Sequence, residues 1–97
     1  MTTDKIAIIT AASKGLGEAC ARLFAQDGYN LVLFSRSSKI KELARELGAD
    51  SLQGDISKVE DLNKLVDYTI DTYGRIDVVG RSVVDNGENY VQITVFI

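Results

Sequence analysis

Apolar residues follow two periods along the first eighty positions of the chain. Short β-type runs predict strands over residues 5–10, 30–35 and 75–79 and a weaker strand over 51–53; the run at 30–35 is nearly continuously apolar, which is typical of a strand covered on both faces. Apolar residues at helical spacing predict helices over residues 15–27, 38–47 and 57–73. Strands and helices that alternate through short links are typical of a parallel sheet with right-handed crossovers.

The helical spacing also predicts which side chains face the sheet. In the first helix these are Leu16, Ala19, Cys20, Leu23 and Phe24, and in the second they are Ile40, Leu43, Ala44 and Leu47. In the third they are Val59, Leu62, Leu65, Val66, Ile70 and Tyr73. Ser57 and Glu60 have the spacing of a capping box, which predicts the start of the third helix.

The pattern changes after Gly80. Two β-rich runs flank a loop at 85–89 that contains Asn-Gly, which predicts a hairpin. The second run, 90–97, alternates, so its odd-numbered apolar residues are expected on a covered face and its even-numbered residues in solvent. The fourth strand can also continue through Val84, which would make one long hairpin.

The junction between the first strand and the first helix carries the clearest chemistry. Glycines at this junction let the backbone turn sharply, and the helix then directs its free N–H groups and positive dipole end at an anion. The residues concerned are Thr10, Ala11, Ala12, Ser13, Lys14, Gly15, Leu16 and Gly17. This segment therefore predicts a phosphate-binding turn.

The same turn resembles the Thr-Gly-x-x-x-Gly-x-Gly motif of the short-chain dehydrogenase/reductase family, with Ala11 in place of the first glycine. The segment 52–56, Leu-Gln-Gly-Asp-Ile, is similar to the family's adenine-contacting segment, and 73–79 is similar to its approach to the fourth strand. The resemblance covers about residues 5–79. It implies an α/β fold with a Rossmann-like open sheet, parallel order 3-2-1-4 and helices on both faces, to which the predicted hairpin adds an antiparallel C-terminal edge strand. We expect one domain over 1–97, with residues 80–97 as a hairpin cap.

The resemblance implies a nucleotide site made by Thr10, Ser13, Lys14, Gly15, Leu16, Gly17, Ser35, Arg36, Asp55 and Ile56. An acidic residue after the second strand would repel a ribose 2′-phosphate, but this chain has Arg36 there and Lys14 in the turn, which favours NADP(H). Alternatively, Lys14 and Arg36 are solvated loop charges. Asp55 can instead be a turn residue before Ser57, and Ser13 can simply shape its turn.

Catalytic residues are not predicted in these 97 residues. The family's catalytic pair is Tyr-x-x-x-Lys, and none of the four tyrosines has a lysine four positions later. The chain has no histidine and one cysteine, which excludes a zinc site or a Cys-His nucleophile within it. We expect an engineered or chimeric scaffold, half of a reductase capped by an unrelated hairpin, with at most vestigial NADP(H) or adenine-nucleotide binding. The alternative is a nucleotide-binding module whose partner chain supplies the other half.

Charge and hydropathy bear on partners and location. The net charge of −3, without a basic block, argues against nucleic acid, and no apolar run is long enough for a membrane span. The N-terminus has no signal-peptide pattern and Cys20 has no partner, so a reducing, cytoplasmic location is expected. One helix cannot cover the whole second face of the sheet, so strands one and two should expose apolar side chains there. This predicts a dimer through that face or through the terminal strand.

Overall fold

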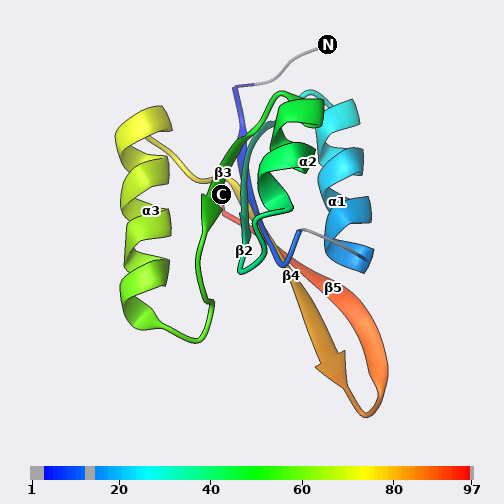
Figure 1. The fold of residues 1–97 in the computed structure, drawn as a ribbon. Helices are drawn as coiled ribbons and strands as arrows, with labels where there is room; N and C mark the ends of the chain where they lie inside the picture. Colours follow the sequence, from blue (N-terminus) through cyan, green and yellow to red (C-terminus); the bar gives the residue numbers. More distant parts are fainter. Residues whose placement is uncertain (1–3, 13–14, 97) are drawn as a thin grey trace.

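The computed structural model describes residues 4–12 and 15–96, and in these residues it has five strands and three helices. The elements are β1 (Ile6–Thr10), α1 (Gly15–Gln26), β2 (Asn30–Ser35), α2 (Ile40–Leu47), β3 (Asp50–Gln53), α3 (Val59–Tyr73), β4 (Val78–Asp85) and β5 (Glu88–Val95). The sheet order is β3-β2-β1-β4-β5, with only the β4–β5 pair antiparallel. Helices α1 and α2 lie on one face and α3 on the other (Figure 1). The predicted fold class is therefore confirmed.

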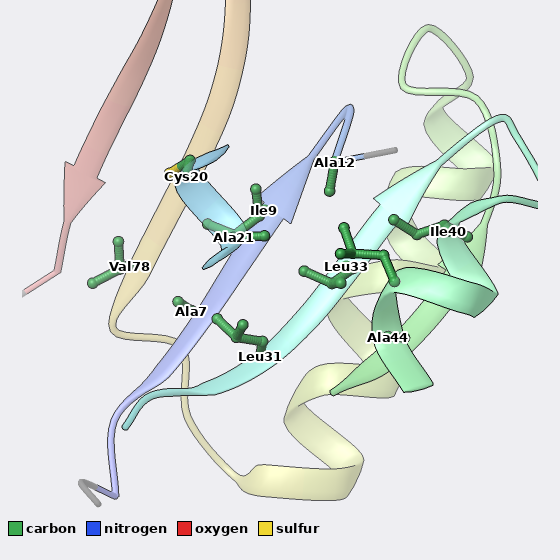
Figure 2. Close-up of a cluster of buried hydrophobic side chains, with 11 residues drawn as sticks. Ala7, Ile9, Ala12, Cys20, Ala21, Leu31, Leu33, Ile40, Ala44 and Val78 are labelled. Atoms are coloured by element: carbon green, nitrogen blue, oxygen red, sulfur yellow. The ribbon is translucent and has the colours of Figure 1, made fainter. Parts of the chain in front are cut away.

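Two groups of buried side chains hold these layers together. The larger group joins α1 and α2 to the sheet and includes Ile9, Leu33 and Ile40 (Figure 2). The smaller group, on the α3 side, contains Ile8, Val32, Phe34 and Leu65. Every residue of β1 is buried, as is every residue of β2 after Asn30.

The expectation that strands one and two expose apolar side chains on the second face of the sheet is therefore wrong. Helix α3 packs over β1 and β2 through Leu65 and its half-buried neighbours, so the apolar side chains there are covered. The part of that face without a helix belongs to β4 and β5. On this face Arg81 and Gln92 are exposed and paired with each other.

Helix α1 buries a different stripe from the predicted one. Its buried residues are Gly17, Cys20 and Ala21, whereas Leu16 is 43% exposed and Leu23 is 62% exposed. The reason is at Gly17, where a Cβ would lie 2.0 Å from the backbone oxygen of Ala11. Because only a glycine allows this approach, the side of the helix that carries Gly17 must face the turn and the sheet, and the two leucines rotate outward.

Helix α3 also departs from the prediction. Leu65 and Thr69 are buried, but Val59, Val66 and Ile70 are exposed. The predicted capping box is absent, because the cap residue is Lys58, without a side-chain cap hydrogen bond. The Ser57 hydroxyl donates instead to Asp55, whose carboxylate is a stronger acceptor partner than a neutral group.

The hairpin is longer and tighter than the first of the two expected forms. Strand β4 begins at Val78 and runs through Asp85, which pairs with Glu88. The connection is therefore Asn86-Gly87, with φ of 51° and 78°. Positive φ at both positions is typical of a type I′ turn, which matches the twist of antiparallel strands. The long-hairpin alternative is thus confirmed, and it projects beyond the other strands (Figure 1).

Candidate functional site: a cleft at the carboxyl ends of the strands

An open cleft of about 930 Å³ lies where β1, β2 and β3 end. Carboxyl ends of parallel strands meet at one edge of a sheet, and open α/β sheets bind ligands there. Six of the predicted site residues line this cleft: Gly15, Leu16, Ser35, Arg36, Asp55 and Ile56. The structure therefore brings together residues from three separate segments of the chain.

Thr10 and Gly17 shape the first of these segments without being among the residues that line the cleft. Thr10 is buried, and its hydroxyl donates to the carbonyl oxygen of Gly80 on β4 at 3.4 Å. Gly17 allows the start of α1 to lie directly against the turn. Ala11, which replaces the first glycine of the motif, has a φ of +52°. Ser13 and Lys14 lie outside the described residues.

The end of β2 is tied to the end of β3 by two hydrogen bonds. The N–H of Gly54 donates to the carbonyl oxygen of Ser35 at 2.9 Å. The side-chain amide of Gln53 donates to the backbone carbonyl oxygen of Arg36, also at 2.9 Å. The Ser35 hydroxyl oxygen accepts from the N–H of Ser37 at 3.2 Å. These contacts fix the backbone at Arg36, whose side chain is exposed at the cleft.

Asp55 is held by the turn that follows β3. One carboxylate oxygen accepts from both the N–H and the hydroxyl of Ser57, at 2.9 and 2.7 Å. The backbone N–H of Asp55 donates to the Asp61 carboxylate at 2.8 Å. The pKa of Asp55 is lowered, first by the hydrogen bonds from Ser57 and further by the positive charges of Arg36 and Lys58. The turn interpretation of Asp55 is therefore what the contacts show, while an adenine contact stays a prediction.

Sequence reasoning missed cleft residues from the hairpin. Ser82 and Asn89 line the cleft although both were assigned to a separate cap. Strand β4 pairs with β1 through Gly80, opposite Ile9, so Ser82 lies just beyond the end of β1, near the turn for which phosphate binding is predicted. The sequence signal that could have placed Ser82 at the cleft was the possible continuation of the fourth strand through Val84.

The described part of the chain offers neither a metal-binding cluster nor a membrane-spanning helix. Among residues 4–12 and 15–96, no three or more His, Cys, Asp and Glu side chains gather in a way that could hold a metal ion. Over the same residues, none of the helices has the length and apolar character needed to cross a membrane. Cys20 is buried below Gly80, and burial raises the pKa of its thiol, which argues against a reactive cysteine.

Comparisons with known proteins identify the family to which this chain belongs. The profile of the short chain dehydrogenase family matches residues 5–87. An uncharacterized oxidoreductase of Staphylococcus aureus is 37% identical over 84 residues, which are 82% of this chain and 36% of that protein. The chain belongs to the short-chain dehydrogenase family. It spans about a third of the length of this relative.

Two solved structures show the same fold with a bound nucleotide. An alcohol dehydrogenase from Thermococcus sibiricus, complexed with 5-hydroxy-NADP, is 39% identical, with a TM-score of 0.70 over 77% of this chain and 35% of that one. A 3-ketoacyl-(acyl-carrier-protein) reductase from Brucella melitensis, complexed with NADH, is 32% identical, with a TM-score of 0.74 over 77% of this chain and 32% of that one. Nucleotide cofactor binding is therefore a property of proteins similar to this chain.

The family match also reaches further than the predicted limit at Val79. It includes the whole of β4 and the Asn86-Gly87 turn, and only residues 88–97 lie beyond it. The expectation of an unrelated segment beginning at Gly80 is therefore wrong for β4.

Proposed function

We propose that the cleft binds the adenosine-phosphate side of NADP(H). The observation that carries this proposal is the convergence of Arg36, Asp55 and the Gly15 end of the phosphate-binding turn on one cleft at the ends of β1, β2 and β3. Net negative proteins do not attract phosphates by overall charge, so a cation fixed at the cleft is needed to select an anionic ligand.

Each segment has a distinct role in this proposal. The N-terminus of α1 at Gly15 faces the pyrophosphate with its free N–H groups, and Lys14 adds positive charge. The Arg36 guanidinium contacts the ribose 2′-phosphate through a forked pair of hydrogen bonds. Asp55 and Ile56 contact the adenine.

The start of α1 has room for such a ligand. The Gly17 contact keeps α1 against the turn. At Gly15, setting aside its chain neighbours and the nearby backbone of α1 itself, no atom of the described residues lies within 4 Å of the position that a Cβ would take, which leaves room for a phosphate. The bound cofactor would supply hydride-transfer chemistry.

The proposal includes no catalysis by these 97 residues alone. They contain no Tyr-x-x-x-Lys pair that could hold and donate a proton to a carbonyl oxygen. They would act as a scaffold with residual affinity, engineered or chimeric in its last residues, or as a module completed by a partner chain. An assay of NADPH consumption with a generic ketone tests this point, and consumption above that of heat-treated protein would contradict it.

Calorimetric titration with NADP⁺, NAD⁺ and ADP tests the binding proposal. We expect a dissociation constant of about 0.1–5 mM for NADP⁺, with NAD⁺ weaker. Arg36→Ala should remove the preference for NADP⁺, whereas Arg45→Ala, an exposed arginine on α2 away from the cleft, should leave it unchanged. Equal affinity of the unaltered protein for NADP⁺ and NAD⁺ would refute the role given to Arg36.

A further inference from the structure

Strand β5 is an exposed edge of the sheet that carries no charge over most of its length. From Asn89 to Phe96 the side chains are Asn, Tyr, Val, Gln, Ile, Thr, Val and Phe, and all except half-buried Val91 are exposed. One side of the β5 backbone pairs with β4, and among the described residues no strand lies beside the N–H and C=O groups on its other side. Such an edge is a template for pairing with another strand.

The opposite edge of the sheet lacks these properties. Strand β3 has only four residues, and it carries Asp50, whose carboxylate accepts a hydrogen bond from the Tyr73 hydroxyl at 2.6 Å. Short edges and charged side chains are the usual devices against edge pairing. Strand β5 has neither device between Asn89 and Phe96, and the described chain has no proline or bulge there.

We propose that β5 pairs antiparallel with β5 of a second copy of this chain, about a two-fold axis perpendicular to the sheet. In the register centred on Gln92, Val91 lies opposite Ile93 of the other copy, and Tyr90 lies opposite Thr94. Next to the axis, apolar Val91 and Ile93 then meet on the α1 side of the sheet, and Tyr90 and Thr94 meet on the other side; further out, Asn89 lies opposite Val95.

We assign the pairing strand to a second copy of this chain because β5 is complementary to itself. No charged side chain is brought opposite another charged one, and from Tyr90 to Thr94 each side chain meets one of compatible character. The contact uses the same strand on both copies, so it is isologous and closes at two chains. This assignment is independent of the nucleotide proposal, because it rests on the edge of the sheet and not on the cleft.

The variant Gln92→Glu tests the register directly. Within one chain the Gln92 side-chain oxygen accepts from Arg81 at 2.9 and 2.7 Å, and a glutamate oxygen would preserve this contact. Across the two-fold axis, however, two carboxylates would face each other. Asn63→Asp, at an exposed position on α3, makes the same change of charge away from the edge and is the matched control.

Sedimentation equilibrium from low to high micromolar concentration is the measurement. We expect the unaltered protein and Asn63→Asp to move from one-chain to two-chain mass, and Gln92→Glu to dimerise about tenfold more weakly or worse. Added salt should recover part of this loss. Matching urea unfolding curves at low concentration would show that the variants fold alike.

Three results would overturn the proposal. The first is a one-chain mass at every concentration. The second is a dimer that Gln92→Glu and Asn63→Asp affect equally, which would place the contact elsewhere, such as the open face of β4. The third is growth beyond two chains, because an isologous edge contact cannot propagate. Hydrogen exchange at β5 amides that slows with concentration would support the edge pairing independently.

Discussion

The central strands and the terminal hairpin have similar side chains but different surroundings. Ile9 on β1 is fully buried, whereas Ile93 on β5 is 42% exposed and Val95 is 62% exposed. The central strands have a strand on each side and a helix on each face, while β5 has one neighbouring strand and partial cover from α1 (Figure 1). Burial here follows from position in the sheet more than from hydrophobicity.

The two regions are joined at Asp77, just before β4. Its backbone N–H donates to the carbonyl oxygen of Ile6 at 2.9 Å, and its own carbonyl oxygen accepts from the N–H of Phe96 at 2.8 Å. Its carboxylate accepts from the N–H of Ile6 and from the guanidinium of Arg75. One residue thus connects β1, β4 and the end of β5.

The largest expected effect comes from a matched pair of phenylalanines. Phe34 on β2 is 2% exposed, and Phe96 after β5 is 53% exposed. Phe34→Ala should lower the free energy of unfolding by about 3–5 kcal/mol, because it leaves a cavity under α3. Phe96→Ala should cost less than about 1 kcal/mol, because little of its ring is removed from water.

Urea unfolding monitored by circular dichroism would compare the two variants. The total free energy of unfolding of a domain of this size is only about 5–15 kcal/mol, so Phe34→Ala should be close to unfolding. If the two variants lowered the free energy of unfolding by similar amounts, the contrast between the central strands and the hairpin would not hold. In that case the hairpin would fold as one cooperative unit with the core, through contacts stronger than its exposure implies.

Much of the fold could be predicted because local patterns carry it. Strand order and helix positions follow from alternating runs and from the family resemblance, and the second helix buries Ile40, Leu43 and Ala44 as its spacing predicts. The Asn86-Gly87 turn also follows from its residues, since few others tolerate positive φ twice in succession.

The remaining errors concern contacts between segments. The rotation of α1 depends on how closely Gly17 approaches Ala11, which spacing within the helix does not contain. Ser57 has the right spacing for a cap, but Asp55 competes for its hydroxyl. The cleft positions of Arg36 and Asp55 were predictable from motifs, whereas that of Ser82 required knowing that β4 continues past β1.

Asp77→Asn should loosen the junction between the two regions, with a smaller effect than Phe34→Ala. The pKa of Asp77 is lowered by the hydrogen bonds from Arg75 and from the N–H of Ile6. A lowered folded-state pKa means that the stabilisation is present above the unfolded pKa of about 3.9 and is lost as the pH falls through the folded value.

The urea midpoint of Asp77→Asn should therefore lie below that of the unaltered protein at neutral pH, and the two should converge in acid. A constant gap at all pH values would show that the charge of Asp77 is irrelevant and that only its geometry matters. Hydrogen exchange should show reduced protection at the amides of Ile6 and Phe96, the two residues whose backbone N–H groups donate to Asp77.

Ala11→Gly should stabilise the central region slightly. Ala11 has a φ of +52°, where a Cβ is strained, and glycine removes that strain. Glycine also gives the unfolded chain more conformational entropy, which offsets part of the relief. We therefore expect the free energy of unfolding to rise by about 0.5–1 kcal/mol. Ala12→Gly is the matched control: Ala12 is buried without a positive φ, so this change should destabilise. Destabilisation by both changes would mean that the turn tolerates Ala11 without strain.

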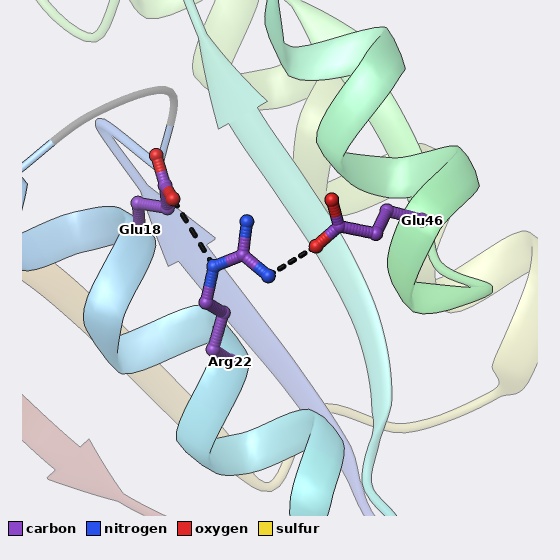
Figure 3. Close-up of polar contacts among 3 residues, drawn as sticks. All are labelled: Glu18, Arg22 and Glu46. Atoms are coloured by element: carbon purple, nitrogen blue, oxygen red, sulfur yellow. Dashed lines mark hydrogen bonds and ion pairs between the residues drawn. The ribbon is translucent and has the colours of Figure 1, made fainter.

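The smallest effect is expected at the surface ion pairs that link α1 to α2. The Arg22 guanidinium contacts Glu18 on its own helix and Glu46 on α2 (Figure 3). All three side chains are more than a third exposed, so solvent and salt screen the attraction, and holding long side chains in place costs entropy. Arg22→Ala should leave the urea midpoint unchanged at physiological salt, with at most a slight fall at low salt. A clear fall at physiological salt would show that charge as well as burial fixes α2 beside α1, and the contrast between core and hairpin would then need an electrostatic component.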